Sequence, residues 1–132
     1  EEGEIRSRAL VAELADAPAT VWASALDGRP LATSSRILVT HLTDVQNTGI
    51  TYADADLRIL LKWGSLPHLM RNGRAVCRLR LADGAWTVYA LRADGTRSRV
   101  VPSAFAKGRL DFTARVDADP ADATYLYELV RD

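Results

Sequence analysis

Aspartates are the side chains of this sequence that could carry hydrolytic chemistry. The ones that suggest it are Asp27, Asp44, Asp54, Asp56, Asp83 and Asp94. A glycosidase needs two carboxyl groups, a protonated acid and an ionised partner, about 5 to 10 Å apart. Asp27, Asp83 and Asp94 each directly precede a glycine, which is typical of tight turns, so we predict turn chemistry for these three. The other three offer oxygen ligands for calcium, but they lie outside any dense Asp/Asn/Gly ligand loop, so we expect no metal.

The two histidines and the single cysteine could supply a base, a zinc site or a nucleophile. His41 lies in an apolar run, which favours a structural histidine, whereas His68 follows Pro67 in a loop and is the better candidate for a surface contact. Cys77 shares a strand face with Leu79, so we expect a buried thiol. The spacing of these residues matches neither a zinc pattern nor a Cys-His nucleophile pair, and we predict no cofactor.

Aromatic residues could offer flat platforms on which a sugar ring stacks. Alternation places Trp22 and Trp86 among apolar neighbours, so we predict that both are buried. Trp63 stands at a strand end and Tyr52 in a long loop, so we expect these two to be exposed. Together with His68 they form the candidate carbohydrate-binding set, with anchoring of a neighbouring domain as the alternative role.

The elements that must position these side chains are β-strands. Residues 37–42 form an apolar, β-branched run with large side chains on both faces, which predicts a central strand, and a polar loop follows over 45–56. Further strands are predicted over 20–26, 57–63, 75–81, 86–91, 98–102, 109–114 and 124–130, and the one over 57–63 is expected to be well buried. The sequence Arg71-Asn72-Gly73-Arg74 predicts a tight hairpin.

Strands recurring every eight to twelve residues, with turn residues between them, predict an all-β fold. We expect a two-sheet antiparallel β-sandwich with Greek-key, Ig-like connections. It should form a single domain over residues 1–132, of which 1–19 are the least regular part.

Composition excludes several classes of partner. Seventeen basic and seventeen acidic residues give a net charge of zero, so no long-range field would attract nucleic acid. The sequence has no apolar run long enough to span a membrane, and its start lacks the features of a signal peptide. With 48% apolar and 26% charged residues it is typical of an ordinary folded domain.

Several runs resemble the C-terminal β-sandwich of bacterial glycoside hydrolases that have a catalytic (β/α)8 barrel. These runs are residues 21–31 (VWASALDGRPL), 34–40 (SSRILVT), 47–49 (NTG), 63–67 (WGSLP), 86–95 (WTVYALRADG) and 126–130 (LYELV). The resemblance covers nearly the whole chain. It implies a non-catalytic accessory domain that stabilises or flanks a barrel, which would be its partner in cis or in trans, and it implies export to the periplasm or the extracellular space. No catalytic residue of that family carries over to this chain.

Two other functions remain open on the residues alone. One is a carbohydrate-binding module that binds polysaccharide through Tyr52, Trp63 and His68. The other is a small hydrolase that uses Asp44, His41 and Asp56, which would require those three groups to converge in one pocket.

Overall fold

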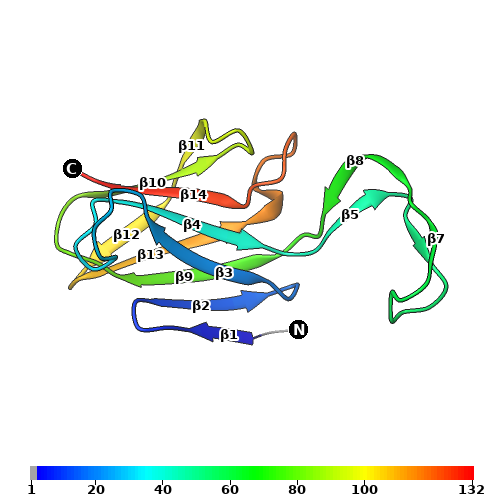
Figure 1. Cartoon of the computed structure of the whole chain (residues 1–132). Coiled ribbons are helices and arrows are strands. Elements are labelled where there is room, and N and C mark those ends of the chain that lie inside the picture. The colour runs from blue at the N-terminus through cyan, green and yellow to red at the C-terminus, as the bar shows by residue number, and fades with distance from the viewer. Residues whose placement is uncertain (1–2) are drawn as a thin grey trace.

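The computed structural model describes residues 3–132 and contains two antiparallel five-stranded sheets packed face to face (Figure 1). The first sheet has the order β1-β2-β9-β13-β12, with strands β1 (Gly3–Arg6), β2 (Leu10–Ala15), β9 (Arg74–Arg80), β13 (Arg109–Arg115) and β12 (Ser103–Ala106). The second has the order β11-β10-β14-β4-β3, with β11 (Arg97–Val101), β10 (Trp86–Leu91), β14 (Leu126–Arg131), β4 (Arg36–Leu42) and β3 (Thr20–Ala25). The predicted all-β, two-sheet antiparallel sandwich is therefore confirmed.

The core lies between the two sheets and follows from strict alternation along the strands. In β13, Leu110 and Phe112 point inward and are buried, whereas Arg109 and Asp111 point outward and bind each other. Ile37 of β4 and Leu129 of β14 contribute to the same core from the opposite sheet. Alternation therefore buries the apolar side chains in the core, while the polar side chains between them stay on the outer face.

A buried tyrosine ties the two sheets together at one end. The Tyr127 hydroxyl accepts a hydrogen bond from the Arg115 amide at 2.9 Å and donates one to the Arg115 carbonyl at 3.2 Å. Burial raises the pKa of this hydroxyl to about 12, so it stays protonated and can donate. A one-turn 3-10 helix, η1 (Val116–Ala118), follows directly after β13.

A second feature is a long arm, which we define as residues 44–71, extending beyond one end of the sandwich (Figure 1). Two antiparallel strand pairs build it: β5 (Val45–Thr48) with β8 (Ser65–Met70), and β6 (Thr51–Tyr52) with β7 (Leu60–Lys62). The arm closes at its root, where the Arg71 amide donates to the Asp44 carbonyl at 2.8 Å and Thr43 Oγ1 donates to the Arg71 carbonyl at 2.6 Å.

Three local predictions are wrong because of this arm. The hairpin predicted at Asn72-Gly73 does not form, since β8 pairs with β5 while β9 pairs with β2 and β13. The strand predicted as buried over residues 57–63 lies in the arm and is largely exposed. The polar loop predicted over 45–56 instead contains β5 and β6. In addition, the opening segment is more regular than expected, because β1 and β2 pair as a hairpin.

Candidate functional site

The arm carries most of the large apolar surface that the molecule exposes. Of the ten large apolar side chains exposed within residues 3–132, seven belong to it: Val45, Leu57, Ile59, Leu61, Trp63, Leu66 and Leu69. Trp63 is 75% exposed and Leu66 is 74% exposed. Single exposed apolar residues are normal on a protein surface, so the concentration of seven of them on one arm is what distinguishes this part of the molecule.

The arm is a preformed structure, held by contacts within itself. Asn47 Nδ2 donates to the Trp63 carbonyl at 2.9 Å, and Thr48 Oγ1 donates to the Pro67 carbonyl at 2.7 Å. Gly64 has a φ of +75°, and a Cβ there would clash with the Thr48 carbonyl oxygen, so only glycine lets the two strands approach this closely. The arm therefore presents its apolar side chains on a defined backbone.

All three residues predicted to bind carbohydrate lie on this arm. Tyr52, predicted to be exposed in a loop, is instead half-buried in β6, where it pairs with Leu60 of β7. His68, also predicted in a loop, is instead an exposed residue of β8. Trp63 stands between β7 and β8 and is exposed. The prediction of an exposed Trp63 is confirmed. A cleft on the arm has a volume of about 340 Å³ and is lined by other residues, among them Gln46, Asn47 and Met70.

The outer faces of the two sheets differ in chemistry. On the first sheet, ion pairs cross the outer face between Arg78 and Glu13 and between Arg109 and Asp111. On the second sheet, the strand register gathers apolar and aromatic side chains on the outer face: Trp22, Leu38, Tyr89, Val100, Leu126 and Val130. Of these, Trp22 is 40% and Val100 is 60% exposed, and the other four are half-buried.

Trp22 corrects one prediction. It pairs across the strands with Thr40 on the outer face of the second sheet, so it is exposed instead of buried. Trp86, by contrast, lies in the core as predicted, and its indole Nε1 donates to the Ala82 carbonyl at 2.9 Å. Alternation defines which residues share a face, but it does not say which face is covered.

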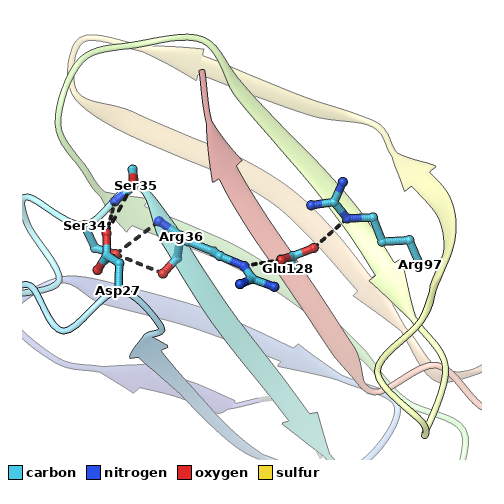
Figure 2. A network of polar contacts seen from close by, with 6 residues as sticks. All are labelled: Asp27, Ser34, Ser35, Arg36, Arg97 and Glu128. Carbon is cyan, nitrogen blue, oxygen red and sulfur yellow. Dashed lines mark hydrogen bonds and ion pairs between the residues drawn. The ribbon is translucent and has the colours of Figure 1, made fainter.

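A buried carboxylate stands in the middle of this apolar face. Glu128 is 3% exposed and accepts hydrogen bonds from Arg36 Nε and Arg97 Nε, each at 2.6 Å, one on each carboxylate oxygen (Figure 2). Burial alone would raise the pKa of Glu128, but the two arginines outweigh it and hold that pKa below its ordinary value of 4.5. Arg97 also lies 4.0 Å from the centre of the Tyr89 ring.

The same network continues to a turn at the start of β4 (Figure 2). Asp27 accepts hydrogen bonds from Ser34 Oγ at 2.7 Å and from the Ser35 amide at 2.8 Å. The Ser35 amide and then the Ser34 hydroxyl hold the pKa of Asp27 far below its usual range. The turn role predicted for Asp27 is therefore confirmed, and Asp94 acts similarly by accepting from the Thr96 amide and hydroxyl.

The groups considered for a hydrolase do not converge. His41 is fully buried in β4, Asp44 lies at the arm root beside Arg71, and Asp56 is exposed near the arm tip, paired with Arg58. Cys77 is also buried, and its surroundings raise the thiol pKa to about 12. Among residues 3–132 no group of His, Cys, Asp or Glu side chains is arranged to hold a metal ion.

A cleft beside β11 and β13 has a volume of about 570 Å³. Its walls are mainly apolar and include Val101, Phe112 and Tyr127. Asp111 is the one carboxylate in its lining, and both of its oxygens are bound by Arg109. A two-carboxylate mechanism therefore lacks its second group in this cleft.

Comparison of the chain with protein-family models, with curated proteins and with solved structures finds no match. In the part of the chain that the structure describes, no helix has the length and apolar character needed to cross a membrane.

Proposed function

We propose that the chain is a non-catalytic accessory domain of a secreted glycoside hydrolase, which packs against a catalytic (β/α)8 barrel and stabilises or flanks it. The observation that carries the proposal is the difference between the two sheet faces. Both outer faces carry ion pairs, but only the second sheet surrounds them with exposed apolar and aromatic side chains, Trp22 and Val100 among them, as a face covered by another domain does.

Two further observations support the proposal. The resemblance of residues 21–130 to the sandwich of barrel hydrolases provides the class of partner. The scattered positions of His41, Asp44 and Asp56 leave the chain without a catalytic set of the predicted kind. Export follows from the same class of partner.

The test mixes this chain with the barrel of a bacterial glycoside hydrolase that has been produced without its own C-terminal sandwich. We expect the chain to raise the unfolding temperature of the barrel, because a partner that binds only the folded state stabilises it. Trp22→Arg should remove this effect, whereas Thr113→Arg, on the charged face of the first sheet, should preserve it. Unchanged barrel stability with the wild-type chain, or hydrolysis of aryl glycosides by the chain alone, contradicts the proposal.

A carbohydrate-binding module is the second candidate function, favoured by the 75% exposure of Trp63 on the arm that also carries Tyr52 and His68. An exposed indole face suits the apolar face of a pyranose ring. Affinity electrophoresis through gels containing plant, algal or mucin-type polysaccharides would then show retardation by one glycan, and Trp63→Ala would abolish it without unfolding the domain. Unchanged mobility in every gel rejects this candidate.

A further inference from the structure

The molecule exposes more surface than a monomer of its mass should. Its accessible surface is 8099 Å². A folded monomer of 14.4 kDa exposes roughly 6,800 Å². The excess is about 1,300 Å², and a stable protein interface takes about 800 Å² from each partner. Because the arm extends beyond the sandwich and holds seven of the ten exposed large apolar side chains, it accounts for an excess of this kind.

The charge of the arm suits a partner that is itself an arm. Residues 44–71 contain three aspartates and three basic residues, Arg58, Lys62 and Arg71, so the arm is neutral as a whole. The complete chain is also neutral, with seventeen residues of each sign. Two copies therefore approach without net repulsion, whereas a strongly charged partner would find no complementary field on this surface.

The backbone of the arm leaves edges open. The pairs β5–β8 and β6–β7 are separate two-stranded sheets, so every arm strand has one partner and one free edge. An isolated two-stranded ribbon in water is marginal and gains stability from a further strand or an apolar cover. A second arm offers both at once.

We propose that the arm is a homodimerisation element, and that two copies of this chain associate arm to arm about a twofold axis. In such an arrangement the same surface is buried on both copies, so the contact closes on itself and does not propagate into a fibre. The apolar face of the second sheet stays free for another domain. This inference therefore does not depend on the function proposed above.

The experiment is sedimentation velocity of the wild-type chain and two variants over a wide range of concentration. The arm variant is Ile59→Ser with Leu66→Ser, which changes side chains that are 58% and 74% exposed and outside the core. The matched control is Val100→Ser, a 60% exposed apolar residue of β11. We expect a wild-type dimer, an arm variant whose dimerisation is weaker by at least about 100-fold because each change counts twice across the axis, and a control that behaves as wild type.

A spin-label measurement locates the contact. Cys77 is fully buried, so Lys62→Cys provides the one accessible thiol for a nitroxide on the arm. Arm-to-arm association predicts a single short distance between the labels of the two copies. A wild-type monomer at all concentrations, a dimer unaffected by the arm variant, growth beyond the dimer, or the absence of a short label distance would each overturn the proposal.

Discussion

At the scale of single residues, Glu128 shows how a charge is kept beneath an apolar face. Its two oxygens are bound by Arg36 and Arg97, whose own side chains are 59% and 48% exposed. The arginines can therefore be hydrated without Glu128, whereas Glu128 cannot be hydrated without them. Removing one side of this cluster should cost much more than removing the other.

We predict that the double variant Arg36→Met with Arg97→Met loses about 3 kcal/mol of unfolding free energy, because it strands a buried carboxylate. Glu128→Gln should lose clearly less. Because the folded pKa of Glu128 lies below 4.5, its contribution is complete above pH 4.5 and disappears as the pH falls through the lowered value. Urea unfolding at pH 7 and below pH 4 measures both effects, and equal losses for the two variants would disprove this asymmetry.

His41 is the second residue with a measurable signature. Both of its ring nitrogens are buried without a hydrogen-bond partner among residues 3–132. Burial lowers the pKa of this imidazole below 6.5. The unfolded chain therefore binds a proton near pH 6.5 that the folded chain does not bind, so stability falls as the pH falls below that value.

We predict that the wild-type chain loses up to about 1.4 kcal/mol per pH unit between the unfolded and the folded pKa of His41. His41→Leu should remove this slope and should raise stability, because it also removes two unpaired polar atoms. His68→Asn is the control, since His68 is exposed in the arm. Thermal unfolding at pH 7.5 and pH 5 tests the prediction, which fails if the slope persists in His41→Leu.

At the scale of elements, sequence patterns predicted the sandwich strands and missed the arm. Alternation in residues 109–114 and the two-faced run in 37–42 gave β13 and β4, because the residues of these strands are sorted by a core that covers them. Residues 57–63 have the same apolar character but have no core beside them. An apolar run in the sequence indicates a surface that favours burial. It does not indicate whether the chain's own core or a separate molecule buries that surface.

Gly73 is a glycine whose role differs from the hairpin turn that its sequence predicts. Asn72-Gly73 is a strong hairpin signal, yet here Gly73 has a different use, since a Cβ would come within 2.8 Å of Thr43 and 3.3 Å of Ala17. The glycine lets the returning arm pass close to the sandwich. Of the candidate site, exposure of Trp63 could be predicted from its place at a strand end, but the placement of Tyr52 and His68 on the same arm required the pairing of strands far apart in sequence.

Gly64→Ala should disturb the arm and leave the sandwich intact. The new Cβ would clash with the Thr48 carbonyl and lie 2.7 Å from the Ile50 amide nitrogen, and neither backbone atom can move without breaking the ribbon. We expect faster amide hydrogen exchange in β5 and β8 and unchanged exchange in β9 and β13. Gly95→Ala, at a similar positive φ but with open space around it, is the matched control and should leave the arm unchanged.

At the scale of the whole molecule, the arm and the sandwich are stabilised by different sets of contacts. The core cluster, which includes Leu79, Leu110 and Leu129, contains no residue of the arm. The arm root is closed by the hydrogen bond between the Arg71 amide and the Asp44 carbonyl, so the sandwich needs only a short connection there. Surface segments with adjacent ends can be removed at little cost to a core.

We predict that replacing residues 45–70 with Asn-Gly leaves a sandwich that unfolds cooperatively, with a midpoint within about 5 °C of the wild-type value. The same variant should be monomeric if arms hold the dimer together. Leu110→Ala is the contrasting control and should cost about 2 to 5 kcal/mol, because it opens a cavity in the core. Calorimetry and sedimentation measure the two properties, and loss of cooperative unfolding on excision would contradict the separation.

The root of the arm has a mechanical consequence. The arm leaves from the end of β4, in one sheet, and returns into β9, in the other, and it continues in the direction of both strands (Figure 1). A pull on the arm tip is therefore shared by the two sheets. Each of the two strands is flanked by neighbours on both sides, β14 and β3 for β4, and β2 and β13 for β9. Tension then acts along the strands, so their hydrogen bonds are loaded together in shear instead of breaking one by one. The sandwich should therefore resist unfolding when force is applied through the arm.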